Sequence, residues 1–437
     1  MPSSNPQPLT PRKTAEPLRF HGLDTLRGVA SILVVLLHAG IPYIFRTPTS
    51  IPWPACEARY SPLVDGVFWS IECFVMPLFF VLSGFFSASL LKLSGPRAFL
   101  NHRTRRILLP QIAAVVLILP LCMYVWALGW VADGLFVPRS YLQPLPKELE
   151  AELFGLGHLW FLQYLYIYCL VLCGASFLRS RYAAADRIAR AWSARFGRRL
   201  DRQLLSAWKP LLPAIPCAVI LYWDSWIVLG CYQTFVPVVS KLLYYAVFFF
   251  TGVFIYRHHR TLPLQARYGK SYLAAAALTF VPLLPLVHRR LVAELTGTPR
   301  VVLAGLLALF AWLTIFGLFG TFLLMKRGYN AATRYLADAS YWVYLVHFPF
   351  VGLAQIAIAR LPILTPVKFL LASTITVALS LMTYHVCARY TWVGEFLNGY
   401  RRQRPTANRA GAPDLGSPPG PAVVFGTTGA GPRRDAA

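Results

Sequence analysis

Long apolar stretches, separated by short polar segments rich in Arg and Lys, recur along most of the chain. A helix needs about 20 apolar residues to cross the hydrocarbon core of a bilayer. With that window, the pattern predicts ten membrane-spanning helices, at residues 27–46, 66–91, 106–130, 156–178, 210–228, 238–256, 271–287, 301–325, 338–358 and 366–386. The predicted fold class is therefore all-α, a polytopic membrane protein of about ten transmembrane helices.

The remaining segments are polar or of low complexity. The predicted domains are a disordered cytoplasmic lead-in (1–19), a membrane domain (20–390) and a disordered cytoplasmic tail (403–437) rich in Gly, Pro and Ala. Within the membrane domain, residues 179–209 are strongly basic and carry Ile188, Trp192 and Phe196 at helical spacing. This pattern indicates an amphipathic helix on the inner leaflet, and a solvated cytoplasmic loop is the alternative.

Composition excludes an ordinary soluble enzyme, because the 437 residues are 57% hydrophobic and only 14% charged. Lys and Arg outnumber Asp and Glu by 42 to 17. In a chain this apolar, the excess is typical of loops that face anionic lipid rather than of a nucleic-acid-binding protein. Of the 42 basic residues, 32 fall in segments on the same side of the membrane as the N-terminus and 10 on the other side, so both termini are predicted to be cytoplasmic.

The first predicted span contains two ionisable residues, which are costly inside a membrane and therefore candidates for function. Arg27 opens the span, and His38 follows eleven positions later, about 16 Å further along a helix. A neutral imidazole in apolar surroundings can take a proton from a hydroxyl group, so His38 is a candidate general base. The alternative is a packing histidine bonded to a backbone carbonyl.

The second predicted span runs back inward and carries Glu72 in its outer third, so Glu72 and His38 are expected at a similar depth. A carboxylate there can orient the imidazole and stabilise its protonated form. A buried glutamate paired with an arginine is the alternative. The nearby Ser83-Gly84 is better explained as a close helix contact than as a nucleophile, because the G-x-S-x-G pattern is absent.

Two later segments add polar residues to this set. His158 and Trp160 stand at the outer start of the fourth span and are expected to face an external substrate, with an interfacial aromatic belt as the alternative. Tyr341, Tyr344 and His347 follow at intervals of three in the ninth span, so they share a face that must look into a cavity or a neighbouring helix. The eight cysteines show no paired metal-site spacing, and no metal ion is predicted.

Four features in this order resemble the acyltransferase family 3 membrane proteins over residues 20–390: the Arg27-x10-His38 pair and the segments PLFFVLSGFF, HLWFLQYL and SYWVYLVHFPF. The combination of MPLFFVLSGFF with GHLWFL is most similar to the branch of glucan biosynthesis protein C, which succinylates osmoregulated periplasmic glucans. The resemblance implies a multi-pass protein of the inner (plasma) membrane. It also implies an O-acyltransferase that moves an acyl group from cytoplasmic acyl-CoA to a hydroxyl of an extracytoplasmic glycan.

The same resemblance implies that Arg27 and His38 are the essential pair of the family. The donor substrate is then acyl-CoA, as succinyl-CoA or acetyl-CoA, with no bound cofactor. Its phosphates are expected to be held by arginines, whose planar guanidinium groups bind phosphate through two hydrogen bonds. The expected donor-binding residues are Arg27, Arg103, Arg105 and Arg106.

At the outer end, His38 is expected to act as general base on the acceptor hydroxyl, with Glu72 orienting its ring. Tyr344 or His347 is expected to donate to the tetrahedral oxyanion. A covalent acyl-histidine is the mechanistic alternative. A secondary transporter or flippase is the competing functional class; the lack of internal repeats and the single depth of the polar residues argue against it. A glycosyltransferase is disfavoured because no D-x-D sequence occurs.

Overall fold

The computed structural model describes residues 21–47, 52–57, 59–134, 155–230, 233–259, 262–325 and 331–398. Helices make up most of these residues, and no strand occurs among them. The predicted all-α, polytopic fold class is therefore confirmed. The lead-in at 1–19 and the tail at 403–437 lie outside the described residues.

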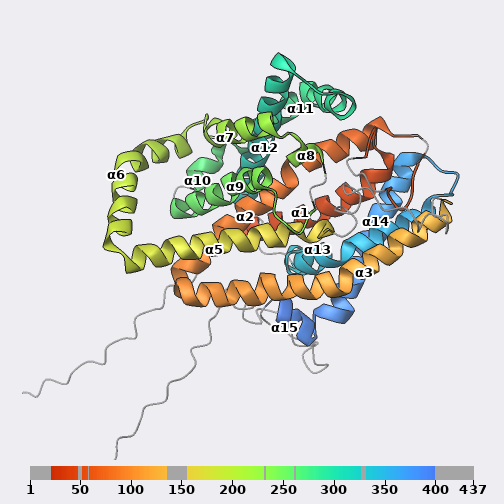
Figure 1. The fold of residues 1–437 in the computed structure, drawn as a ribbon, viewed down its shortest axis with the longest axis horizontal. Helices are drawn as coiled ribbons and strands as arrows, with labels where there is room; N and C mark the ends of the chain where they lie inside the picture. Colours follow the sequence, from red (N-terminus) through yellow and green to blue (C-terminus); the bar gives the residue numbers. More distant parts are fainter. Residues whose placement is uncertain are drawn as a thin grey trace, which may run out of the picture.

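A helix stands at the place of each of the ten predicted spans (Figure 1). The helices are α1 (His21–Gly40), α2 (Pro62–Arg103), α3 (Leu109–Ala132), α5 (Trp160–Arg181), α6 (Ala183–Leu205), α7 (Leu211–Trp223), α8 (Trp226–Leu229), α9 (Val239–Arg257), α10 (Leu262–Gln265), α11 (Gly269–Val292), α12 (Gly297–Leu324), α13 (Ala331–Ile358), α14 (Thr365–Thr383) and α15 (Trp392–Asn398).

Eight segments of the described chain are long and apolar enough to cross a membrane. One of them, Pro62–Ala132, comprises both α2 and α3, and its 71 residues far exceed the length of one crossing. Gly95 has φ 76°, a left-handed conformation that favours glycine, and Pro96 follows it, so the helix is broken there. The chain then reverses direction into α3 (Figure 1). With α7 as a shorter apolar helix, ten crossings remain a prediction.

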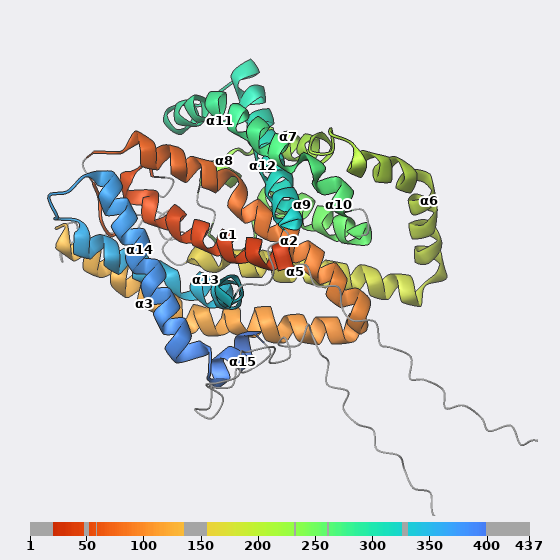
Figure 2. The ribbon, with the colours of Figure 1, turned by 180° about the vertical axis from the view of Figure 1, so that it is seen from behind.

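The predicted basic segment forms the helix α6, which extends away from the other helices between α5 and α7 (Figures 1 and 2). Ile188 on this helix is exposed. The predicted helix is therefore present, whereas its contact with a lipid leaflet stays a prediction.

Helices α2 and α9 cross with their backbones in close approach. A Cβ atom on Gly84 would lie 1.9 Å from the carbonyl oxygen of Phe249, and one on Gly252 would lie 2.1 Å from the carbonyl oxygen of Val81. Both distances are far below van der Waals contact, so only glycine lets these two backbones approach as they do. The interpretation of Ser83-Gly84 as a helix contact agrees with this geometry.

Helices α1 and α13 lie side by side and run in the same direction. Near the start of both, Nη2 of Arg27 donates to the carbonyl of Ala337 at 3.1 Å. Near the end of α1, Nδ1 of His38 lies 3.2 Å from Nε2 of His347. Eleven residues separate the first pair from the second on α1 and ten on α13, so the two helices stay in register along this length. Their pairing fixes Arg27 and His38 at the two ends of one helix–helix contact.

The segment 52–57, predicted to lie on the outer side, is tied to α14 by a largely buried ion pair. Nζ of Lys368 lies 2.7 Å from Oε2 of Glu57 and 2.7 Å from the carbonyl oxygen of Ala359. The side chain of Lys368 is only 6% exposed. Removing one partner of such a pair leaves a charge in a site that excludes water, which costs more than the pair itself contributes.

Replacing Glu57 by Gln is therefore expected to lower the free energy of unfolding by about 3 kcal/mol, because the Lys368 ammonium stays buried without its counter-charge. Thermal or denaturant unfolding in detergent measures the loss. Asp186→Asn is the matched control: it removes the partner of Arg190 and Arg179, whose side chains are 71% and 45% exposed, so its effect is expected to stay below about 1 kcal/mol. Equal losses in the two variants would contradict the prediction.

Candidate functional site

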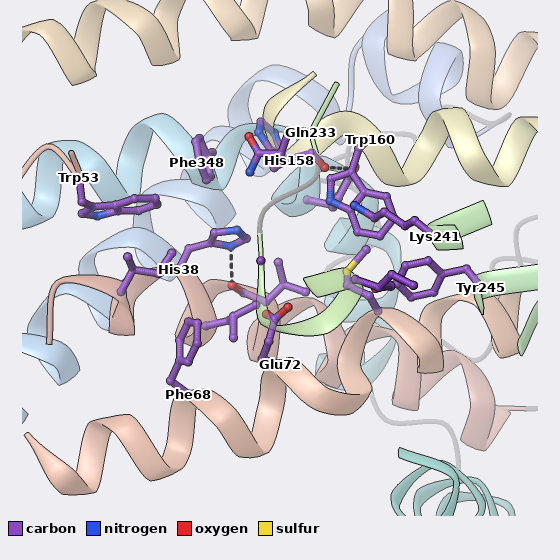
Figure 3. A pocket seen from close by; sticks show the side chains of 17 residues that line it. His38, Trp53, Phe68, Glu72, His158, Trp160, Gln233, Lys241, Tyr245 and Phe348 are labelled. Carbon is purple, nitrogen blue, oxygen red and sulfur yellow. Dashed lines mark hydrogen bonds between the residues drawn. The ribbon is translucent and has the colours of Figure 1, made fainter. Parts of the chain in front are cut away.

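A cavity of about 80 Å³ lies between α1, α2, α5, α9 and α13. Five of the residues predicted from the sequence line it together, although they come from four separate helical segments (Figure 3). They are His38, Glu72, His158, Trp160 and Tyr344. The expectation that His38 and Glu72 lie at a similar depth is thus met, because both face the same cavity.

The hydrogen bonds of His38 define which of its nitrogen atoms carries the proton. Nδ1 lies 2.9 Å from the carbonyl oxygen of Val34, and a carbonyl oxygen can only accept, so Nδ1 bears the hydrogen (Figure 3). In the neutral ring, Nε2 then carries the lone pair, and no hydrogen bond occupies it among the described residues. His38 therefore presents to the cavity the atom that a general base requires.

His347 stands directly behind His38, away from the cavity. It is fully buried, and its Nδ1 lies 3.0 Å from the carbonyl oxygen of Val343 and 2.8 Å from that of Tyr344. By the same argument its Nδ1 is protonated, and its Nε2 accepts from Nδ1 of His38 at 3.2 Å. His347 is thus a proton acceptor aimed at the far side of the base.

This pairing corrects the expected partner of His38. The predicted orienting group was Glu72, but no hydrogen bond of the described structure joins the two. The carbonyl of Val34 and Nε2 of His347 hold the imidazole instead, because α13 is packed against α1 on the side where Nδ1 points. Glu72, on α2, faces the cavity from another wall (Figure 3).

Two hydrogen bonds from the side chains of His158 and Tyr344 to backbone carbonyls join the start of α5 to α13. Nε2 of His158 donates to the carbonyl oxygen of Leu345 at 3.1 Å, and the Tyr344 hydroxyl donates to the carbonyl oxygen of His158 at 2.6 Å. The ring of His158 stacks on Phe348 with centroids 4.8 Å apart. Its Nδ1 is buried without a hydrogen-bond partner, so the lone pair there is ready to accept from a ligand.

The expected oxyanion donors, Tyr344 and His347, are already engaged in hydrogen bonds to the backbone. The hydroxyl of Tyr344 and the Nδ1 hydrogen of His347 both point at backbone carbonyls, so neither is offered to the cavity. The positive charge on the cavity wall comes from Lys241 of α9, whose Nζ lies 3.3 Å from the centroid of the Trp160 ring. Lys241 also attracts Glu72 electrostatically. A lysine within an apolar span is a signal by itself, so inspection of charged residues in the spans identifies it.

The residues expected to bind the donor gather at the opposite end of α1 and α13. Arg27 donates to the carbonyl of Ala337, and the hydroxyl of Tyr341 donates to the carbonyl of Arg106 at 3.0 Å. Since Ala337 and Tyr341 are one helical turn apart, Arg27 and Arg106 lie at the same end of α13. Tyr341 was expected near the substrate with His158; it shares a helix with Tyr344 but bonds the carbonyl of Arg106 at the other end of α13 instead.

The guanidinium groups of these arginines differ in how far they are already engaged. Arg106 donates to the carbonyls of Glu395 and Phe396 in α15, and Arg27 also lies 3.8 Å from Asp24. Arg103 packs over the ring of Phe99 with Nε buried and without a hydrogen-bond partner. Arg105 is exposed in the same turn. In the described parts of the chain, no group of three or more metal-ligating side chains is arranged to hold a metal ion.

Comparison with known families decides the class of protein. The family model of the acyltransferase domain, acyltransferase family 3, matches residues 20–385. The chain belongs to this family. It is accordingly an integral membrane acyltransferase. No curated protein and no solved structure matches the chain.

Proposed function

We propose that this acyltransferase lies in the inner membrane and moves a succinyl or acetyl group from cytoplasmic acyl-CoA to a hydroxyl group of an extracytoplasmic glycan. The favoured acceptor is a periplasmic glucan. The observation that carries the proposal is the lone pair of His38 Nε2, which faces a cavity while Nδ1 is held by Val34 and His347. A base in this state needs only a hydroxyl within hydrogen-bond distance to act.

The donor enters from the end of the bundle that holds the arginines. Arg103 and Arg105, with Arg27 and Arg106 nearby, supply guanidinium groups for the phosphates of CoA. The pantetheine arm then runs beside α1, whose uninterrupted helix spans about 16 Å between Arg27 and His38. The thioester carbonyl reaches the level of His38 in this way, and the adenine nucleotide stays in the cytoplasm.

The reaction is an acyl transfer with balanced proton movements. His38 Nε2 takes the proton of the acceptor hydroxyl as its oxygen bonds to the thioester carbonyl carbon. The Nδ1 hydrogen of the resulting imidazolium is shared with His347, so the positive charge is stabilised. The tetrahedral intermediate then releases the CoA thiolate, which takes the proton from His38 and leaves an ester on the acceptor. Lys241 provides positive charge on the cavity wall for the oxyanion.

The acceptor contacts the outer half of the cavity. Glu72 and Lys241 offer an acceptor and a donor for sugar hydroxyl groups, Trp160 offers an aromatic ring, and Nδ1 of His158 accepts one hydrogen bond. The cavity of about 80 Å³ is smaller than the roughly 300–1,000 Å³ of typical ligand sites. We therefore expect the segments around it to move apart when the two substrates bind.

Mass spectrometry of envelope glycans tests the function. Glycans from cells that express the chain are expected to carry an acyl mass that is missing when the gene is deleted, and the mass difference identifies the group as succinyl or acetyl. The alternative, a transporter or flippase of a polar substrate, predicts unmodified glycans and no loss of thioester. Purified protein that consumes radiolabelled acyl-CoA only when a glycan extract is present supports the enzyme; glycan spectra that are identical with and without the gene contradict the proposal.

A further inference from the structure

A glutamine in the middle of the bundle bonds the backbone of the base residue. Gln355 of α13 is fully buried, about two turns beyond His347. Its Nε2 donates to the carbonyl oxygens of His38 and Ala39, at 3.1 Å each. Its Oε1 accepts the indole hydrogen of Trp53 at 2.6 Å. Both amide hydrogens and the amide oxygen are thus used, in a region where an unpaired polar group is costly.

The sequence of α1 explains why His38 needs this donor. In a continuing helix, the carbonyl of His38 would accept from the amide hydrogen four residues later. That residue is Pro42, which has no amide hydrogen, so the carbonyl is left without its helical partner. Gln355 supplies the missing donor from the neighbouring helix. The carbonyl end of the last turn of α1, which carries the His38 ring, is therefore bonded to α13.

Trp53 determines which way the amide of Gln355 faces. An indole nitrogen can only donate, so the amide atom next to it must be the oxygen, and the NH2 group then faces α1. Trp53 lies in the segment 52–57 and lines the cavity (Figure 3). Its ring is edge-on to those of Trp126 and Phe348, at centroid distances of 4.9 and 5.7 Å. Two hydrogen bonds thus connect the cavity wall to the backbone of His38.

We propose that Gln355 is a positioning residue for acyl transfer: it fixes the last turn of α1, and hence the place of the His38 imidazole, while Trp53 keeps its amide in the orientation that this requires. The inference rests on the proposed role of His38 as base. It adds that a side chain on the outer segment acts on the base through Gln355 and not by contact with the reacting atoms.

The test compares variants that remove single hydrogen-bonding groups. Gln355→Met keeps the length of the side chain but cannot donate to the carbonyls of α1. Trp53→Phe keeps an aromatic ring on the cavity wall but removes the indole hydrogen. Gln111→Met is the matched control, since Gln111 is also buried in a membrane helix, α3, but has no described bond to α1. Each protein is reconstituted in lipid nanodiscs and assayed with radiolabelled acetyl-CoA and succinyl-CoA on a glycan extract from cells lacking the gene.

A displacement of about 1 Å in a reacting group lowers a rate by up to about 100-fold. Gln355→Met is therefore expected to lower kcat roughly 10- to 100-fold, while KM for the acyl-CoA stays within about twofold, because the donor arginines are at the other end of α1. Trp53→Phe is expected to lower kcat by about 3- to 10-fold, and Gln111→Met to leave it unchanged. The double variant Trp53→Phe/Gln355→Met is expected to be no slower than Gln355→Met, because Trp53 acts through Gln355.

A folded Gln355→Met protein with the kcat of the wild type, or a double variant whose losses simply multiply, would overturn the inference. Equal loss of kcat and melting temperature in Gln355→Met and Gln111→Met would do so as well, since it indicates a general packing defect. If Gln355→Met does not fold, Trp53→Phe decides alone, and a wild-type kcat there overturns the inference. His38→Ala separates this outcome from failure of the proposed function: an active His38→Ala protein refutes the base, whereas an inactive one beside a fully active Gln355→Met protein refutes only the role of Gln355.

Discussion

Replacing His38 by alanine is expected to lower the rate of acyl transfer by about 100- to 10,000-fold, the range that a positioned general base contributes. The structure gives the reason: Nε2 of His38 faces the cavity with its lone pair, and the protonated ring is supported from behind by His347. No other described histidine both lines the cavity and donates its Nδ1 hydrogen to a second histidine. The measurement is the transfer of label from acyl-CoA to a glycan extract by the purified protein.

The matched control is His258→Ala. His258 bonds the carbonyl of Phe254 at the end of α9 and does not line the cavity, so its loss is expected to leave the rate within about twofold. A His38→Ala protein that acylates its acceptor at the wild-type rate would contradict the assignment of the base. Label that stays on the His38 peptide after acid-free denaturation of the wild-type protein would favour the covalent acyl-histidine over direct transfer.

Replacing Gly84 or Gly252 by alanine is expected to destabilise the protein by about 1–3 kcal/mol, since the new methyl group overlaps a backbone oxygen that no rotamer change can move away. The helices must separate to accommodate it. Because α2 carries Glu72 and α9 carries Lys241, separation also displaces these two groups on the cavity wall. A lower melting temperature, together with a higher KM for the glycan, is the expected result.

Two glycines elsewhere provide the control for this prediction. A Cβ atom on Gly66 of α2 or Gly305 of α12 would meet no atom within 4 Å. Alanine at these positions is expected to leave stability unchanged or to raise it by up to about 1 kcal/mol, the difference in helix propensity. Stability losses as large in Gly66→Ala as in Gly84→Ala would show that the close crossing of α2 and α9 is not the cause.

The positions of the helices could be predicted because the length of an apolar run and the distribution of Lys and Arg both follow from the bilayer. The same argument singles out His38, Glu72 and His158, since an ionisable group in a span must face a cavity or a partner. The structure places all three around one cavity. Family membership was predicted from four short motifs and is confirmed over residues 20–385.

The partners of those residues could not be predicted, because they depend on how two helices far apart in the sequence are rotated against each other. His38 and His347 are 309 residues apart, and a small rotation of either helix would bring another group to Nδ1. Tyr341 was misplaced for the same reason: spacing by three gives one face of α13, but that face is long enough to reach both ends of the bundle. Gln355 is polar but not ionisable, so a search for ionisable residues in the spans passed over it.

The pairing of α1 with α13 has a consequence for how the protein is made. Arg27 bonds a carbonyl 310 residues later, so the first helix enters the membrane long before the helix that completes its contacts has been synthesised. During that interval the imidazole of His38 and the carbonyl left open by Pro42 have no partner from α13. Ribosome-bound intermediates that end before residue 331 therefore lack the contacts of α13 with His38, and the proposed acyl transfer requires that nearly the whole chain has been translated.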